Sequence, residues 1–216
     1  MSGRRLVVLR HGETDHNARG VWQGQLDSEL SERGHEQARA AAHELRALAP
    51  SRVVASDLTR AARTGQDVAD VCGTPISFDE RWREIHVGAW AGMTAQEVRE
   101  QYPEDQDRLI SGEDFRRGGH GESVADVADR VRAALSDLLA DLPDGETAVV
   151  ATHGVTGRVV AAELVGMDQR LAWQALAGLG NCHWAVLTEG AYGWRIQAWN
   201  QSSTAAAAVP ASGDPA

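Results

Sequence analysis

Arg10 and His11 are the sharpest chemical signal in the sequence, within the segment Leu9-Arg10-His11-Gly12-Glu13-Thr14. They directly follow a short apolar run that is typical of a buried strand. The planar guanidinium of Arg10 suits a phosphate group, and the His11 imidazole is a candidate nucleophile. Gly12 permits the backbone to approach a ligand closely. Taken alone, this segment is explained equally well as a surface turn with a solvated histidine.

Three later residues repeat this pattern of a chemically active side chain shortly after an apolar run. Arg60 is placed in the first turn of a predicted helix, where backbone amides favour anions. Glu84 lies among basic residues after another run, and His153 directly follows a third. Ligands of open α/β sheets bind at the carboxyl ends of strands, so these residues are predicted to meet. Together they would form a phosphate site with a nucleophile and a proton donor.

The elements that must position these residues alternate between apolar strands and amphipathic helices. Strands are predicted at residues 5–9, 52–55, 74–78, 147–152, 183–187 and 194–199, and helices at 34–48, 58–71, 123–142 and 155–165. The apolar runs are continuous, which favours a parallel sheet covered on both faces. We therefore predict an α/β protein, a three-layer α/β/α sandwich around a mostly parallel central sheet, with the last two strands as a closing hairpin.

Two regions lack this alternation. Residues 91–122 are polar and glycine-containing, and they are predicted to form a lid or insertion within a domain that spans residues 1–200. Arg116 and Arg117 in this region are best explained as a solvated charge pair, with contact to a substrate carboxylate as the alternative, and the role of His120 stays open. Residues 201–216 are rich in alanine, serine and proline and are predicted to be a disordered tail.

The composition excludes several classes of protein. The chain has 216 residues, 43% hydrophobic and 24% charged, with a net charge of −10 at pH 7. A nucleic-acid or anionic-membrane binder needs a basic face, so neither partner is expected. No apolar stretch approaches the ~20 residues that span a bilayer, and no secretory signal is evident. The two cysteines form neither a disulfide framework nor a metal-binding pair, so we predict a cytoplasmic protein without metal or cofactor.

An ordered set of motifs extends the local signals to most of the chain. The motifs are LRHGET at 9–14, WQGQLD at 22–27, SDLTRAARTG at 56–65, REIHVGAWAG at 83–92, GGHGES at 118–123, THGVTGRVV at 152–160 and GNCHWAVL at 180–187. In this order they resemble the histidine phosphatase superfamily, in its phosphoglycerate-mutase-like branch. The first, second and last motifs, with WN at 199–200, are most similar to the actinobacterial glucosyl-3-phosphoglycerate phosphatases. The resemblance implies a phosphoglycerate-mutase-like fold.

The resemblance also implies roles for individual residues. His11 matches the phosphorylated histidine and Glu84 the proton donor and acceptor, while Arg10, Arg60 and His153 match the phosphate-binding residues. Further positions implied to bind substrate are Asn17, Gln23, Gly24 and Gly154. The chain departs from the usual family pattern at Asp57, His86 and Val155-Thr156. None of these departures removes a catalytic group, but they leave the substrate open.

The chemistry that these residues predict is metal-independent hydrolysis of a phosphomonoester through a phosphohistidine. Arg10, Arg60 and a protonated His153 would supply positive charge, and these cations would keep His11 neutral. Glu84 would be protonated when the alcohol leaves. The substrate is a small phosphorylated metabolite, either glucosyl-3-phosphoglycerate or a broad range of esters. The alternatives are a cofactor-dependent phosphoglycerate mutase and, less favoured, a non-catalytic phospholigand-binding protein; a homodimer is left open.

Overall fold

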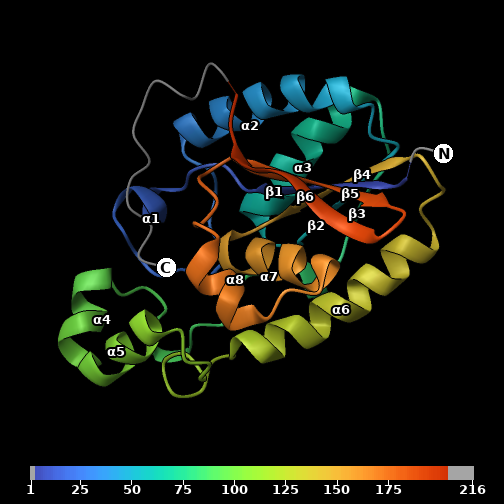
Figure 1. Ribbon diagram of the computed structural model, residues 1–216. Coiled ribbons are helices and arrows are strands. Elements are labelled where there is room, and N and C mark those ends of the chain that lie inside the picture. Colours follow the sequence, from blue (N-terminus) through green and yellow to red (C-terminus); the bar gives the residue numbers. More distant parts are fainter. Residues whose placement is uncertain (1–2, 204–216) are drawn as a thin grey trace.

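The computed structural model describes residues 3–203 and is built around one mixed sheet of six strands (Figure 1). The strand order is β3-β2-β4-β1-β5-β6. The strands are β1 (Arg5–Arg10), β2 (Arg52–Ala55), β3 (Ile76–Phe78), β4 (Thr147–Thr152), β5 (Trp184–Gly190) and β6 (Gly193–Gln201). The first four run parallel, whereas β5 pairs antiparallel with both β1 and β6. The predicted α/β sandwich and closing hairpin are thus confirmed.

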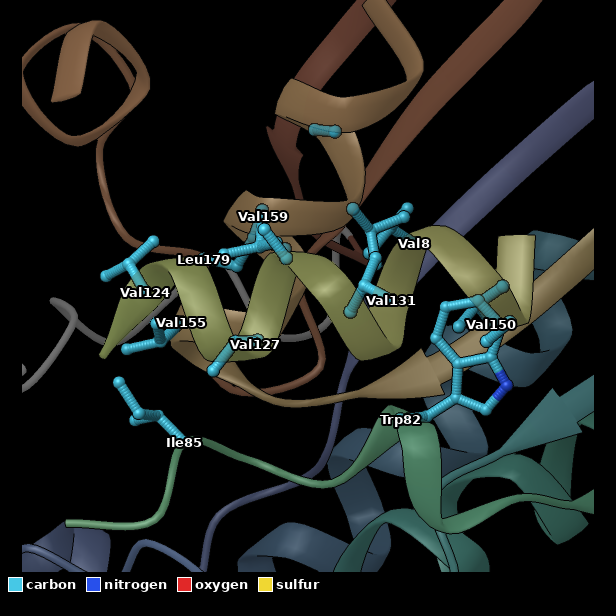
Figure 2. Packing of buried hydrophobic residues seen from close by; sticks show 14 of the residues in the cluster. Val8, Trp82, Ile85, Val124, Val127, Val131, Val150, Val155, Val159 and Leu179 are labelled. Atoms are coloured by element: carbon cyan, nitrogen blue, oxygen red, sulfur yellow. The ribbon is translucent and has the colours of Figure 1, made fainter. Parts of the chain in front are cut away.

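Helices cover both faces of the sheet (Figure 1). One face carries α2 (Glu32–Leu45) and α3 (Thr59–Cys72), and the other carries α6 (Val124–Ala140) and α7 (Gly154–Val165). Successive side chains of β1 alternate between these layers, as strand geometry requires. Val7 and Leu9 join the core under α2 and α3, while Leu6 and Val8 join the core under α6 and α7. Figure 2 shows the second core, with Val8 among residues of α6 and α7.

Capping residues shift the helix boundaries slightly from those predicted. The Ser31 side chain accepts a hydrogen bond from Gly34 N, so α2 begins at Glu32 rather than at 34. The helix ends at Leu45, and the last three residues of the predicted helix form a 3₁₀ turn instead. Ser123 forms a capping box with Asp126, which fixes the start of α6 at Val124.

Four short helices lie outside the helices predicted from the sequence. They are α1 (Asp15–Ala18), α4 (Ala95–Gln101), α5 (Pro103–Ser111) and α8 (Gln169–Ala175). Helices of this length show too few turns for an apolar period to stand out. The helices α4 and α5 lie within the predicted insertion, to one side of the sheet (Figure 1).

The C-terminal strand reaches slightly beyond the predicted domain boundary at residue 200. Gln201 belongs to β6, and Ser203 is buried. The remainder of the predicted tail, residues 204–216, lies outside the described residues. Between residues 3 and 203, no helix is both long and apolar enough to cross a membrane.

Candidate active site

Three adjacent strands end at the candidate site. In the sheet, β4 lies between β2 and β1, and Ser56, His153 and His11 directly follow these three strands. The amide of His11 donates to Thr152 O at 2.9 Å, and that of Ser56 donates to Ala151 O at 2.9 Å. The strand register therefore continues into the site, as expected for residues at the carboxyl ends of parallel strands.

A pocket opens at these strand ends. Every predicted site residue except His153 lines it; the complete lining is Arg10, His11, Asn17, Val21, Trp22, Gln23, Gly24, Arg60, Glu84, Ile85, Val87, Gly154 and Val155. His153 lies behind this surface, and its ring contacts that of His11 at a centroid distance of 5.1 Å. Residues separated by more than 140 positions in the chain therefore share one site.

The His11 ring is held in a single tautomer. Its Nδ1 lies 2.7 Å from Gly12 O, and a carbonyl oxygen can only accept, so Nδ1 carries the proton. Nε2 then bears a lone pair, which accepts from Arg60 Nε at 3.3 Å. Burial, followed by the charges of Arg60 and Arg10, holds the pKa of His11 well below its ordinary value. His11 is therefore a neutral imidazole with its nucleophilic nitrogen at the pocket.

Glycine permits this loop to pack against α2. A Cβ on Gly12 would lie 2.5 Å from Gly34 O, far closer than real Cβ atoms approach a carbonyl oxygen. Gly12 N also donates to the Thr64 hydroxyl on α3 at 3.1 Å. The nucleophile loop is thus clamped between two helices, which limits movement of the His11 ring.

Backbone carbonyls hold the two arginines. Arg60 donates through its two terminal nitrogens to Leu26 O and Gly24 O, both at 2.7 Å. Arg10 donates to Leu179 O at 2.6 Å. Arg60 is 1% exposed, and its burial lowers its pKa to about 10, so the guanidinium is still charged at neutral pH. The pocket therefore contains fixed positive charge beside the nucleophile.

His153 differs from its predicted state. Burial, then the charges of Arg60 and His11, hold its pKa well below the ordinary histidine value, so its surroundings disfavour the protonated ring expected from the sequence. Nε2 lies 2.9 Å from the Ser56 hydroxyl, and Nδ1 is buried without a hydrogen-bond partner among the described residues. If Ser56 donates to Nε2, the neutral ring carries its proton on Nδ1 and remains a donor for an anion.

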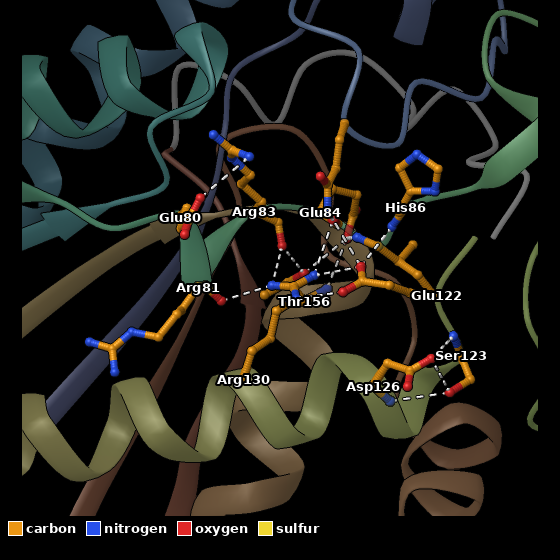
Figure 3. A network of polar contacts seen from close by, with 12 residues as sticks. Glu80, Arg81, Arg83, Glu84, His86, Glu122, Ser123, Asp126, Arg130 and Thr156 are labelled. Atoms are coloured by element: carbon orange, nitrogen blue, oxygen red, sulfur yellow. Dashed lines mark hydrogen bonds and ion pairs between the residues drawn. The ribbon is translucent and has the colours of Figure 1, made fainter. Parts of the chain in front are cut away.

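The Glu84 carboxylate sits at the N-terminus of α7 (Figure 3). One oxygen accepts from Thr156 N at 3.0 Å and lies 3.1 Å from the Thr156 hydroxyl, and the other accepts from Val155 N at 3.1 Å. Ile85 N donates to the carboxylate as well, at 3.0 Å. These donors fix the carboxylate although Glu84 belongs to an irregular loop after β3 and not to a strand. Thr156, a departure from the family pattern, thus contacts the predicted proton donor directly.

Two amide side chains complete the polar lining. Asn17 Oδ1 accepts from Thr14 N and from Asn181 Nδ2, both at 3.2 Å. Gln23 Oε1 accepts from the Ser28 hydroxyl at 2.7 Å. No hydrogen bond within residues 3–203 engages the NH₂ group of either amide, so both groups can donate to an anion in the pocket.

Several residues of the site were not predicted. The apolar wall of the pocket consists of Val21, Trp22, Ile85, Val87 and Val155. Of these, only Val21 lies outside the motifs quoted above, and single apolar residues within a motif carry no pattern that separates pocket lining from ordinary packing. Ser56 lies at the start of the motif at 56–65 and directly after a strand. This position is the one sequence feature that could have indicated its contact with His153.

The insertion, residues 91–122, contributes no residue to the described pocket lining. It is tied to the loop after Glu84 where Ala89 N donates to Gly118 O at 3.1 Å. Gly118 has a φ of +53°, and a Cβ there would lie 2.4 Å from Val87 O, so this crossing requires glycine. The two chain segments therefore cross with their backbones in contact.

The arginines of the insertion point elsewhere. Arg117 is buried with its guanidinium 4.2 Å from the Phe115 ring centre, and burial lowers its pKa to about 10. Arg116 donates to Asp126 at 3.1 Å. The His120 ring lies 5.9 Å from that of His86. The predicted solvated charge pair is thus wrong for Arg117, which is buried, whereas the Arg116 side chain is 61% exposed. Neither arginine lines the described pocket, so contact of Arg116 with a substrate carboxylate stays an untested alternative.

Comparison with known families agrees with this geometry. The family model for the histidine phosphatase superfamily (branch 1) matches residues 6–202. The chain belongs to this superfamily. The predicted family is thus confirmed, and with it the predicted fold.

Named relatives cover nearly the whole chain. A glucosyl-3-phosphoglycerate phosphatase of Mycolicibacterium vanbaalenii is 40% identical over 95% of this chain and 98% of its own. A solved structure of a mycobacterial glucosyl-3-phosphoglycerate phosphatase with VO₃ is 37% identical, covers 92% of this chain and 100% of that one, and superposes with a TM-score of 0.86. The Salmonella paratyphi C protein named Probable phosphoglycerate mutase GpmB is 31% identical over 90% of this chain and 89% of its own. The superfamily and these relatives identify the chain as a phosphatase acting on phosphoric monoesters.

Proposed function

We propose that the chain hydrolyses a small phosphorylated metabolite through a phosphohistidine formed on His11. The observation that carries this proposal is the fixed tautomer of His11. Its Nδ1 proton is committed to Gly12 O, and its Nε2 lone pair accepts from Arg60 Nε at the pocket, a hydrogen bond that is given up when Nε2 attacks phosphorus and Arg60 donates to a phosphate oxygen instead. A neutral nitrogen next to fixed positive charge is suited to attack on phosphorus.

In the first step, His11 Nε2 attacks phosphorus and the P–O bond to the alcohol breaks. Arg10 and Arg60 face the negative charge that spreads over the transferred oxygens, and His153 adds a donor through Nδ1 when Ser56 donates to its Nε2. The amide groups of Asn17 and Gln23 add neutral donors. Protonated Glu84 gives its proton to the leaving oxygen, so a neutral alcohol departs.

In the second step, the Glu84 carboxylate accepts a proton from water as that water attacks the phosphohistidine. The P–N bond breaks, its electron pair returns to His11 Nε2, and phosphate is released. Glu84 thus ends protonated and ready for the next cycle, which is the reciprocal acid and base role expected of one group.

The alcohol part of the substrate is proposed to be a sugar conjugate of glycerate. Support comes from relatives at 39–40% identity that are named for glucosyl-3-phosphoglycerate. The apolar wall formed by Val21, Trp22 and Val87 offers a surface for the carbon face of such a group. The relative named as a mutase, at 31% identity, favours a phosphoglycerate mutase as the second candidate.

Trapping the phosphoenzyme tests the mechanism. Denaturation in SDS at alkaline pH of enzyme mixed with ³²P-labelled glucosyl-3-phosphoglycerate should yield a base-stable, acid-labile phosphoprotein, and His11→Ala should yield none. Release of phosphate should proceed equally with and without 2,3-bisphosphoglycerate. With 3-phosphoglycerate as substrate, a requirement for that bisphosphate and formation of 2-phosphoglycerate instead of free phosphate would identify a mutase.

Metal independence, location and assembly also belong to this proposal. No group of three or more His, Cys, Asp or Glu side chains in residues 3–203 is arranged to hold a metal ion, so chelator should leave turnover unchanged. Cys72 and Cys182 are both free, which suits a reducing cytoplasm. A homodimer through the β5–β6 hairpin is the proposed assembly, to be measured by light scattering.

A further inference from the structure

An ion pair lies beneath the loop that carries Glu84 (Figure 3). Arg130 of α6 donates through Nε to Glu122 Oε1 at 2.9 Å and through a terminal nitrogen to Glu122 Oε2 at 3.1 Å. This is the two-pronged geometry in which guanidinium and carboxylate fit best. The two side chains are only 17% and 21% exposed, and neither lines the pocket.

The same guanidinium also fixes the backbone before and at Glu84. Arg130 donates to Arg81 O at 2.8 Å, to Arg83 O at 2.7 Å and to Glu84 O at 3.1 Å. These three carbonyls belong to a segment outside any strand or α-helix. A single side chain therefore provides hydrogen bonds that a regular element would otherwise provide.

Glu122 holds the backbone on the other side of Glu84. Its carboxylate accepts from His86 N at 2.8 Å, and its own amide donates to His86 O at 2.7 Å. Gln25 Nε2 bridges the two groups, since it lies 3.1 Å from Glu84 O and 3.4 Å from Glu122 Oε2. Arg130 and Glu122 together thus hold the backbone on both sides of Glu84, from residue 81 to residue 86.

We propose that Glu122 and Arg130 are positioning residues for Glu84, an inference that rests on the proton-transfer role in the proposed function. A proton donor works only within hydrogen-bond reach of the leaving oxygen, and a displacement of about 1 Å can cost ~10²-fold in rate. Loss of Arg130 removes the side-chain donor of Arg81 O and one donor each from Arg83 O, Glu84 O and the partly buried Glu122 carboxylate, which favours a rearranged loop. The described hydrogen bonds of His11 and Arg60 are made with other residues, so binding of phosphate should be retained.

The test compares Arg130→Gln with Arg132→Gln on the same helix. Arg132 forms ion pairs with Asp129 and Glu163, and its side chain is 60% exposed. Neither of these partners belongs to the Glu84 loop. For an alkyl phosphate, Arg130→Gln should lower kcat by roughly 10–100-fold with little change in KM. For p-nitrophenyl phosphate, whose leaving group needs no proton, the loss should stay below about threefold. Arg132→Gln should remain within about twofold on both substrates.

A double variant separates positioning from general destabilisation. In a Glu84→Gln background, Arg130→Gln should cause no further loss on the alkyl phosphate, because the group it positions is already disabled. Equal losses on both substrates, or a full additional loss in that background, would overturn the proposal. Glu122→Gln, which keeps the side-chain size, supplies the same readouts if Arg130→Gln does not fold. If Glu84→Gln alone shows no leaving-group dependence, the proton-transfer role itself fails, and that result is visible without any Arg130 variant.

Discussion

Arg60 of the pocket and Arg116 of the insertion are held in opposite ways. In the pocket, Arg60 is 1% exposed and is held by two backbone carbonyls and by His11. In the insertion, the Arg116 side chain is 61% exposed and pairs with Asp126, which is itself 34% exposed. Buried carbonyl contacts give a fixed geometry, whereas an exposed ion pair contributes only ~0–1 kcal/mol and restrains little.

This difference separates the groups that are proposed to act on phosphate from the residues of the insertion. The groups proposed to act on phosphate come from strand ends, a helix start and the Glu84 loop, and all are fixed by the frame of the fold. The insertion lines no part of the described pocket but supports its wall, because Trp22 N donates to Met93 O and Gly92 N donates to Trp22 O, both at 2.8 Å. Substitutions in the two regions should therefore have very different effects.

Glu84→Gln should have the largest effect of the substitutions that contrast the two regions. A glutamine cannot cycle a proton, so turnover of alkyl phosphates should fall by ~10²–10⁴-fold. The loss should be much smaller for p-nitrophenyl phosphate, whose leaving group departs as the anion. A matched series of esters with graded leaving-group pKa measures this directly. A uniform loss across the series would mean that Glu84 only shapes the pocket.

Arg60→Met should have the next largest effect on turnover. The variant keeps an apolar stem but removes the donor to His11 Nε2 and the charge beside it. We expect a loss of ~10²–10³-fold in kcat/KM, the usual effect of removing one preorganised donor at a developing charge. Arg63→Met, one turn further along α3 at an exposed position, is the control and should remain near wild type. Similar losses for both variants would place the effect in α3 as a whole.

The frame of the fold was predictable from the sequence because its signals are strong and local. The run Thr147–Thr152 is entirely buried, and its continuous apolar character indicated a central parallel strand. Since the carboxyl ends of parallel strands lie at one edge of a sheet, the sequence predicted that His11 and His153 meet, and their rings lie 5.1 Å apart. The protonated state predicted for His153 stays a prediction for the phosphate complex, and the burial that lowers its pKa depends on packing that no local pattern records.

The support around Glu84 could not be predicted in the same way. Arg130 donates to carbonyls, which every residue possesses, so its partners leave no mark in the sequence. Glu122 lies in the motif at 118–123, but its spacing from Arg130 spans a loop and a helix start. Contacts of this kind depend on the path of an irregular loop, and they are visible only in three dimensions.

The buried histidines predict a pH dependence of stability. The pKa of both His11 and His153 lies well below the ordinary value of 6.5 in the folded protein. Below about pH 6.5 the unfolded chain therefore binds more protons than the native one. The free energy of unfolding should fall as the pH decreases, by up to ~1.4 kcal/mol per pH unit for each histidine that stays neutral. Above pH 6.5 this contribution is fully present.

Urea unfolding between pH 5 and 7.5 measures this slope. His11→Gln should remove the part contributed by His11 while His153 remains. Inorganic phosphate should weaken the dependence, because a bound anion favours protonated histidine nearby. A slope that is identical in wild type and His11→Gln would show that other groups control acid stability.

Arg116→Gln should have the smallest effect and is the most direct test of the contrast between the two regions. The side chain contacts Gly121 O and Asp126 at an exposed position, and it does not line the pocket. We expect kcat/KM to stay within about twofold for both a carboxylate-bearing ester, such as glucosyl-3-phosphoglycerate, and a neutral sugar phosphate. Use of both substrates is essential, because a contact with the carboxylate would reduce turnover of the first and leave the second unchanged. Such a selective loss would show that the insertion moves over the pocket during turnover and that specificity belongs to it, whereas equal activity on both would leave specificity with the apolar wall around Trp22.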